Sequence, residues 1–456
     1  MLHCLRMGTH AEKKFIKDYK NSFDTLIVNA NIVAHTLDSM AAFLGVELKR
    51  KFVIDPQTYA FQNRELLLSS SSTPENEKLK VSILKLIEKY GPILKSILVE
   101  QGRSVVPNDF SGEAGKSFQQ ELCAKVLCFQ ENEIKSSLLN NEAYGEYIQF
   151  LNKNTTEFSE TPVFVIAPYF YMQIATLEEW LPINIECVNV MGTLHQKENI
   201  AAQIVLNQDI LLDSASIKKI VEAYSNLNIK KVLLWVDDLH EQEVSVPFLN
   251  GFVELIKGLK SHGKEVVNLY GGYFSLLLTK GKRYLDGVCN GMEYGEHRAV
   301  FPVGGGIPRA KFYLPSIHNR LLYRTVLDTL FHKKLLVIPD YYSKVCSCQT
   351  CHELLKNDPA DNFIQYGESD SITFSRNTKG SSRLVSMSFP TVHTKENCLR
   401  HYLNVKQNEW KKIEVQPMSE LIGELDGTYA EYEKELGASL LYLRTWKNIL
   451  AKLSFD

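Results

Sequence analysis

The chain has 456 residues, of which 45% are hydrophobic, and a formal net charge of −2. This size allows one large domain or two to three smaller ones, each with its own core. The nearly balanced charge excludes a basic field over the whole molecule, so any attraction to nucleic acid must come from a local patch.

The chain shows no sign of export or membrane insertion. No stretch approaches the roughly 20 apolar residues that span a bilayer, and the segment from Met1 to Met7 is too short and mixed for a secretory signal. Nine cysteines, an odd number, indicate a reducing compartment rather than a disulfide framework. We therefore expect a cytoplasmic protein that does not associate with membranes.

Short apolar, β-branched segments alternate with helical stretches along the chain, which is typical of a parallel α/β sheet. Eight or nine such units suit a (β/α)8 TIM barrel. The predicted strands cover residues 24–28, 51–55, 162–166, 202–206, 231–236, 265–269, 284–288, 311–314 and 334–338.

A long helical insertion interrupts this pattern at about residues 66–160. Apolar residues between Lys78 and Val99 recur at helical spacing, and Gly91-Pro92 is expected to divide the segment into two helices. We predict a barrel domain over residues 1–340 that contains this insertion. A zinc-binding and helical region follows at 341–456, with an irregular segment at about 357–391.

Several predicted strands end in polar residues or glycine. Asp55, Asp237 and Asp238 end two strands, and Gly271-Gly272 and Gly291 end two others. One such aspartate alone is explained by capping of the next helix. Four decorated strand ends together favour an active site, because the active sites of barrels lie at the carboxyl ends of the strands.

Three thiols lie within six residues in Cys346-Ser-Cys348-Gln-Thr-Cys351. Thiolates at this spacing can converge on one tetrahedral zinc ion, and His401, His393 and Cys398 are the candidates for the fourth ligand. Three thiolates and one further ligand leave no position for water, so the zinc would be structural. The alternative is a chance cluster of reduced loop cysteines.

The ordered set of motifs resembles the tRNA-guanine transglycosylase superfamily, (β/α)8 enzymes that carry a C-x-C-x-x-C zinc motif after the barrel. The resemblance covers roughly Asp24 to Trp410, with the insertion outside it. It rests on four segments that precede the cysteines: Asp55-Pro-Gln-Thr-Tyr59, Val236-Asp237-Asp238, Tyr270-Gly271-Gly272 and Gly291-Met-Glu-Tyr-Gly295-Glu296.

The resemblance implies exchange of guanine for a 7-deazaguanine base in tRNA or DNA, with a structural zinc ion and a homodimer. His401 looks like part of the helix that packs over the zinc module in the family. Two features differ from the family pattern: the strand at 310–314 lacks the family's nucleophilic aspartate, and Tyr270 stands where the family has glutamine. They indicate a divergent paralogue, such as those that act on DNA.

Base exchange requires a carboxylate that attacks C1′ of the sugar, as in retaining glycoside chemistry. Asp55 is one predicted catalytic carboxylate. Asp237 or Asp238 is the second, and only one of these neighbours should face the barrel mouth because adjacent strand residues point to opposite sides. A carboxylate that accepts hydrogen bonds from the purine N1–H and amino group would select guanine-like bases.

Other residues are predicted to shape a substrate pocket. Tyr59 either stacks on the flipped-out base or fills the core, and Tyr270 takes the place of the base-reading glutamine. Gly271, Gly272 and Gly291 let a flat base approach the backbone. Glu296 is expected to brace the pocket loop, and Gly304-Gly-Gly306 is expected to form a loop near the substrate.

Two alternatives remain open. Arg309, Lys311, His318 and Arg320 form a basic group that either contacts phosphate or lies on an ordinary solvated surface. The chain as a whole is either a transglycosylase or a non-catalytic nucleic-acid-binding subunit that keeps the barrel and the zinc. The missing carboxylate at 310–314 favours the subunit, and the retained Asp55, Asp237 and Asp238 favour the enzyme.

Overall fold

The computed structural model describes residues 2–73, 76–140, 146, 161–292, 295–301, 309–378 and 381–455. The chain forms two compact units, Met1–Phe301 and Pro302–Asp456. Glu293 and Tyr294 of the predicted pocket loop and the glycines of Gly304-Gly-Gly306 lie outside the described residues.

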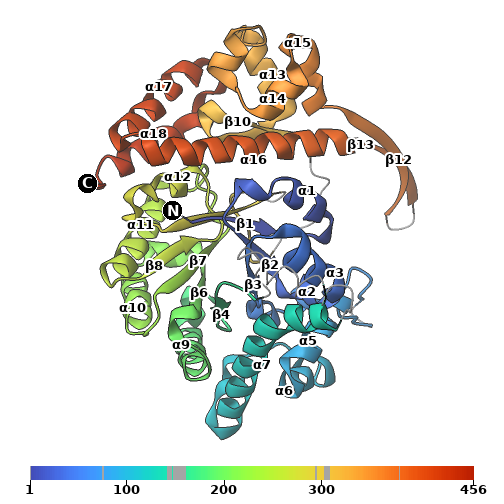
Figure 1. The fold of residues 1–456 in the computed structure, drawn as a ribbon, viewed down its shortest axis with the longest axis vertical. Helices are drawn as coiled ribbons and strands as arrows, with labels where there is room; N and C mark the ends of the chain where they lie inside the picture. Colours follow the sequence, from blue (N-terminus) through green and yellow to red (C-terminus); the bar gives the residue numbers. More distant parts are fainter. Residues whose placement is uncertain are drawn as a thin grey trace. The chain divides into compact units, whose positions relative to one another are not determined.

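The first unit is built around eight parallel strands in a barrel-like sheet, compatible with a TIM barrel (Figure 1). The strands follow one another around the sheet in chain order, and β9 pairs with β1. A short extra strand, β5 (Tyr171–Met172), pairs with β6. The eight strands are β1 (Leu2–Met7), β2 (Thr25–Asn29), β3 (Lys51–Asp55), β4 (Val165–Ile166), β6 (Ile200–Asn207), β7 (Lys231–Asp237), β8 (Glu265–Asn268) and β9 (Gly287–Gly291).

The barrel is nearly closed between β3 and β4. These two strands are not paired along a ladder. The amide N–H of Val163, just before β4, donates to the carbonyl of Phe52 in β3 at 3.0 Å. The chain enters β4 from a long excursion after β3, and β4 has only two residues, so little backbone is available there for a ladder.

Seven of the nine predicted strands overlap barrel strands, one forms a strand outside the barrel, and one was wrong. Residues 311–314 do form a strand, β10 (Lys311–Leu314), but it pairs antiparallel with β11 (Asn319–Leu322) in a separate sheet of the second unit. Residues 334–338 form turns before a cis bond to Pro339. The first barrel strand is instead β1, which was not predicted because Arg6 and His3 interrupt its apolar residues.

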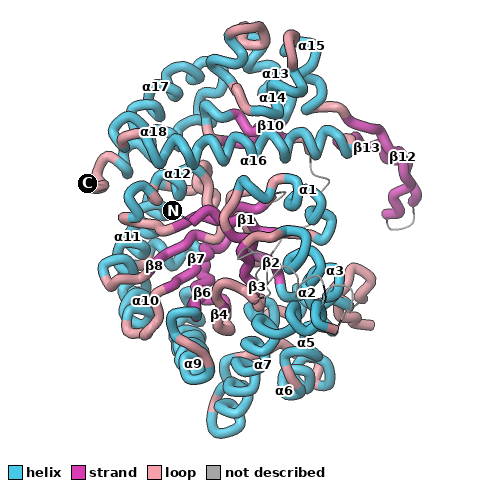
Figure 2. The backbone as a smooth tube through the Cα atoms, in the orientation of Figure 1, coloured by secondary structure: helices cyan, strands magenta, loops and turns pink. Residues whose placement is uncertain are grey.

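Helices surround the barrel strands in the first unit (Figure 2). The segment between β3 and β4 is helical, as predicted, and Gly91 with φ 108° separates α5 from α6, which has Pro92 in its first turn. The helices are α1 (Lys13–Asp18), α2 (Ala30–His35), α3 (Leu37–Ala41), α4 (Arg64–Leu67), α5 (Val81–Tyr90), α6 (Pro92–Lys95), α7 (Gly112–Leu139), α9 (Leu177–Leu194), α10 (Ser214–Ser225), α11 (Val246–Ser261) and α12 (Tyr273–Leu277).

The second unit combines two β-hairpins with helices. The predicted irregular segment at 357–391 is not irregular, because most of it forms a long antiparallel ribbon of β12 (Ser369–Thr378) and β13 (Ser381–Pro390). The predicted C-terminal helical region is confirmed. The helices are α13 (Tyr323–His332), α14 (Gln349–Leu355), α15 (Pro359–Asn362), α16 (Val392–Val415), α17 (Met418–Leu436) and α18 (Leu441–Leu450).

Alternate residues of the barrel strands form one buried cluster. Cys4 and Ile27 belong to it, as do Val53, Val205 and Leu233. Because side chains alternate between the two faces of a strand, residues two positions further along these strands lie on the same face. This alternation brings the polar residues near the strand ends to one mouth of the barrel.

Candidate functional site

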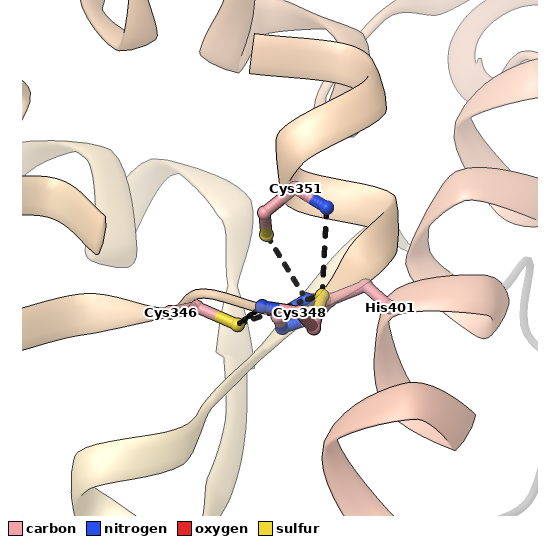
Figure 3. A group of neighbouring side chains, drawn as sticks. All are labelled: Cys346, Cys348, Cys351 and His401. Atoms are coloured by element: carbon pink, nitrogen blue, oxygen red, sulfur yellow. Dashed lines mark hydrogen bonds between the residues drawn. The ribbon is translucent and has the colours of Figure 1, made fainter. Parts of the chain in front are cut away.

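The three cysteines and His401 converge in the second unit (Figure 3). Cys346 follows a helical turn over Tyr341–Val345, and Cys348 and Cys351 lie at the start of α14. The Cys348 sulfur accepts the amide N–H of Cys351 at 3.4 Å and so caps this helix. His401 comes from the middle of α16. The predicted cluster of three thiols and one histidine is thereby confirmed as a buried constellation.

Its dimensions suit a tetrahedral metal ion. The four candidate ligand atoms lie within 4.8 Å of one another. His401 Nδ1 is 3.8 Å from the Cys346 sulfur and 3.4 Å from the sulfurs of Cys348 and Cys351. Zinc bonds of ~2.3 Å to sulfur and ~2.0 Å to nitrogen would separate tetrahedral ligand atoms by roughly 3.5–3.8 Å. The cluster can therefore hold an ion such as zinc with little rearrangement.

A neighbouring strand orients the imidazole of His401. Its Nε2 lies 2.7 Å from the backbone carbonyl oxygen of Tyr313 in β10. A carbonyl only accepts, so Nε2 carries the proton and Nδ1 is left with its lone pair toward the thiols. The Phe312 ring stacks on the imidazole at 4.1 Å. The packing thus selects the tautomer that a metal requires.

The electrostatics of the cluster favour bound positive charge. Hydrogen bonds from Cys346 and Cys351 hold the pKa of Cys348 far below its usual value. Burial lowers the pKa of His401, but the adjacent Cys351 and Cys348 outweigh it and raise this pKa to about 10. A buried thiolate needs a cation beside it. An imidazolium or a metal ion can supply that charge.

The other two candidates for the fourth ligand lie elsewhere on α16. His393 is exposed in its first turn. The Cys398 sulfur contacts the backbone carbonyl of Tyr366 at 3.6 Å. Neither belongs to the four-residue cluster, so His401 is the residue that the fold brings to the thiols.

A second polar constellation lies at the carboxyl ends of the barrel strands and centres on Asp55. Arg6 Nη2 forms an ion pair with Asp55 Oδ2 and donates to Asn29 Oδ1 at 2.8 Å. Asp55 Oδ1 accepts hydrogen bonds from the Tyr169 hydroxyl at 2.6 Å and from the backbone N–H of Gln57 at 3.0 Å. Asp55 is 0% exposed and Arg6 is 2% exposed. This buried pair was not anticipated, because β1 was not recognised as a strand.

Asp237 ends β7 and is partly exposed. Its Oδ2 accepts the Tyr171 hydroxyl at 2.6 Å, and its Oδ1 accepts the Val300 amide at 2.7 Å. Asp55 and Asp237 therefore each accept a tyrosine hydroxyl from the segment just after β4. Tyr169 and Tyr171 alternate in that segment, a spacing visible in the sequence but not recognised as significant.

Asp238 differs from its neighbour. It is exposed, has φ 48°, and its Oδ1 lies 2.8 Å from His297 Nδ1. The His297 ring stacks on that of His240 at 4.1 Å. Of the two adjacent aspartates, Asp237 is therefore the one that contacts the tyrosine at the strand ends, and Asp238 turns to the surface.

Aromatic rings fill much of the barrel interior at this end. Tyr59 is 5% exposed and packs edge-on against Trp235 at 5.1 Å. Trp235 also contacts Tyr270 at 5.0 Å, and the Tyr270 hydroxyl accepts from Arg298 Nη1 at 3.1 Å. Tyr59 and Tyr270 thus belong to one buried cluster, and stacking of Tyr59 on a base stays a prediction.

The glycines pack closely against protein atoms. A side chain at Gly271 would lie 2.7 Å from Ser275, and one at Gly272 would lie 2.7 Å from Glu241 Oε2 and 2.8 Å from Glu296 Oε2. Gly291 is more open, with the Gly295 carbonyl 3.5 Å from the same position. The absence of side chains at Gly271 and Gly272 is therefore already explained by packing within the barrel.

Glu241, which sequence reasoning missed, forms a buried carboxylate pair with Glu296 across Gly272. It accepts the Ser275 hydroxyl and the Phe274 amide at the start of α12. Burial raises the pKa of Glu241 to about 7, the Ser275 hydroxyl opposes this rise, and Glu296 adds to it. Glu296 accepts a hydrogen bond from Gln242 Nε2 at 3.3 Å, and its predicted role in bracing the pocket loop stays a prediction.

Comparisons with known proteins yield no relative. No family model, no curated protein and no solved structure matches the chain. Among the described residues, no helix combines the length and apolar character needed to cross a membrane.

Proposed function

We propose that the protein is a transglycosylase that exchanges guanine for a 7-deazaguanine base in tRNA or DNA. The observation that carries the proposal is a pair of nitrogen donors, unpaired within the described ranges, on the buried Arg6 guanidinium at the barrel mouth. Arg6 Nε and Nη1 are buried and have no hydrogen-bond partner among the described residues. Buried donors are nearly always paired. Such donors beside Asp55 suit a ligand that brings oxygen or ring-nitrogen acceptors.

A second buried side chain supports the same ligand. Gln203 in β6 is 1% exposed, and neither its amide nitrogen nor its amide oxygen has a partner among the described residues. Gln203 lies two positions from Ala201 and from Val205, which both belong to the interior cluster. Its side chain therefore lies on the same face of β6 and points into the barrel interior. A guanine edge offers both acceptors and donors, which an arginine, an aspartate and an amide complement.

In this proposal Asp237 is the nucleophile, because it is the partly exposed carboxylate at the mouth. An Asp237 oxygen attacks C1′, the C1′–N9 bond breaks, and guanine leaves as an anion that takes up a proton from solvent. The incoming 7-deazaguanine then forms a new C1′–N bond as its N–H proton is lost and the ester to Asp237 breaks. Arg6 and Asp55 hold the base edge throughout.

The metal in this proposal is a structural zinc ion held by Cys346, Cys348, Cys351 and His401. Four protein ligands leave no position for substrate or water. The zinc would tie α14 to α16 and so stabilise the second unit. It takes no part in the proposed base exchange.

A non-catalytic nucleic-acid-binding subunit is the second candidate. The observation that favours it is the closure of Asp55: the carboxylate is fully buried, and Arg6, Tyr169 and Gln57 occupy its oxygens. The buried rings of Tyr59 and Tyr270 also take up space that a flipped base would need.

Base exchange with labelled guanine separates the two candidates. Purified protein is incubated with tRNA or duplex DNA, and incorporation of label is measured. We expect the Asp237→Asn variant to lose incorporation and the control Asp238→Asn, at an exposed neighbouring position, to keep it. Incorporation that survives Asp237→Asn would remove Asp237 as the nucleophile. Nucleic-acid binding without any incorporation by the wild-type protein would favour the subunit.

A further inference from the structure

The second unit contains a groove of about 1080 Å³ between the start of α13 and the base of the β12–β13 ribbon. Pockets for small molecules usually span ~300–1,000 Å³, so this groove suits an extended ligand. Its walls come from the residues just before β10, the end of β11, the first two turns of α13, the segment that leads into β12, and the end of β13. Figure 1 shows the ribbon extending away from the helices of this unit.

Two arginines line one wall of the groove. Arg309 and Arg324 are both exposed. Neither forms an ion pair with a carboxylate in the part of the chain that the structure describes. Glu368 also lines the groove, so cationic groups outnumber carboxylates there. This balance favours an anionic ligand.

Another part of the groove wall is rich in hydroxyl groups. Ser369, Ser386 and Ser388 line the groove, and the Ser388 hydroxyl donates to that of Ser369 at 2.7 Å. The same face continues along the ribbon, where Thr373 pairs with Ser386 and Ser371 with Ser388. Arginines and the hydroxyls of serine and threonine are among the side chains that contact phosphate oxygens in protein–DNA complexes.

Three apolar side chains that line the groove are partly exposed. Leu322 and Met387 are each 37% exposed, and Ile364 is 48% exposed. Exposed apolar side chains together with cationic and hydroxyl groups suit a ligand that alternates charged phosphates with flat bases. An acidic peptide could bond to the same arginines and hydroxyls, but it offers no flat bases to the exposed apolar side chains.

We infer that this groove binds a strand of nucleic acid, with its phosphates on Arg309 and Arg324 and along the serine wall. The inference deepens the proposed function, on which it rests, because it names the surface that holds the polymer. Arg309 is thereby selected from the basic group of the sequence. His318 is instead buried against Glu409, and Arg320 stacks on Tyr402 at 3.6 Å. Lys311 does not line the groove.

Fluorescence anisotropy with labelled single-stranded DNA, single-stranded RNA and duplex DNA tests the inference over a series of salt concentrations. We expect Arg309→Ala and Arg324→Ala each to weaken binding about tenfold. Each should also reduce the slope of log affinity against log salt by roughly 0.7, one phosphate contact on a single strand. Lys411→Ala is the matched control, because Lys411 is exposed on α16 outside the groove.

Several outcomes would overturn the inference. The first is that the wild-type protein binds none of the three probes. The second is that the arginine variants bind as tightly, and with the same salt slope, as Lys411→Ala. The third is that a second copy of the chain occupies the groove, which would be seen as dimers that the arginine variants abolish. If Asp237→Asn and wild type both lack base exchange but the arginines still control binding, the inference stands and the transglycosylase proposal fails. If the wild-type protein catalyses base exchange and the arginine variants bind nucleic acid as tightly as wild type, the transglycosylase proposal stands and the inference about the groove fails.

Discussion

Arg6 and Asp55 form an ion pair that links the first and third strands of the barrel across β2. The pair is sealed from solvent, and Asn29 of the intervening strand shares the same guanidinium nitrogen. Because one carboxylate both satisfies a buried cation and lies at the proposed base-binding site, substitutions of Asp55 affect stability as well as activity.

Asp55→Ala is therefore expected to destabilise the protein by about 3–5 kcal/mol, since it leaves the Arg6 charge buried without its partner. Urea denaturation measures this change. Asp238→Asn, which alters an exposed ion pair with His297, should cost less than about 1 kcal/mol. Equal stabilities for the two variants would contradict the buried ion pair.

Zinc content is the most direct check of the Cys3His cluster. The wild-type protein should carry one zinc ion per chain by elemental analysis. Cys348→Ser and His401→Ala should each lose most of it, because each removes one of four ligands. Cys128→Ser is the control, since this exposed cysteine lies outside the cluster. Unchanged zinc in both ligand variants would rule out a zinc site here.

Stability should depend on pH through Glu241. The folded pKa of about 7 lies above the ordinary value of 4.5. Between these two pKa values the folded protein keeps a proton that the unfolded chain has released. The free energy of unfolding therefore falls as pH rises through this window. The wild-type protein should lose on the order of 2–4 kcal/mol of unfolding free energy through Glu241 between about pH 4.5 and pH 7, and Glu241→Gln should abolish this loss.

Urea midpoints of Glu241→Gln and wild type across this pH window measure the difference. Glu243→Gln serves as the control, because Glu243 is a strongly exposed partner of His240. Parallel pH profiles of wild type and Glu241→Gln would show that Glu241 titrates normally.

Gly272 separates two buried carboxylates, so Gly272→Ala should destabilise the protein. The new methyl group would lie 2.7 and 2.8 Å from oxygens of Glu241 and Glu296, which must then move. We expect a loss of about 1–3 kcal/mol in thermal unfolding. Gly423→Ala in α17, where nothing lies within 4 Å, should instead stabilise by about 0.5–1 kcal/mol.

Gln203 offers a test that separates stability from ligand binding. Gln203→Leu replaces an unpaired buried amide with an apolar group and should stabilise the free protein by about 1 kcal/mol while it weakens binding of guanine. The matched control is Gln130→Leu. The Gln130 amide bonds both the carbonyl and the N–H of Ile166 at 2.8 Å, so its loss should destabilise. Destabilisation by both variants would show that Gln203 is paired.

The strand prediction succeeded where apolar residues follow one another without a charged residue between them. The interior strands at 51–55, 231–236 and 202–206 were recognised because each is a β-branched run between helical stretches. β1 was missed, because His3 and Arg6 interrupt its apolar residues, and local pattern does not distinguish such a segment from a mixed loop. Residues 334–338 were mistaken for a strand, because a short apolar run carries no information about pairing partners.

The sequence likewise predicts only some of the ligands of the metal cluster. The three cysteines are close in sequence, so their spacing predicts the site directly. The fourth position is decided by α16, whose path over Phe312 and Tyr313 brings His401 to the thiols and turns His393 to the solvent. No local pattern distinguishes these two histidines.

By itself, the sequence determined the alternation of strands and helices, the break at Gly91-Pro92, the thiol triad and the polar strand ends, since all of these depend on neighbouring residues. Only the tertiary structure decided that the barrel starts with Leu2–Met7, that Asp55 pairs with Arg6, and that Asp237 rather than Asp238 contacts the strand-end tyrosine. These features join residues distant along the chain. Their geometry follows from sheet register and side-chain alternation, which exist only once the strands have paired.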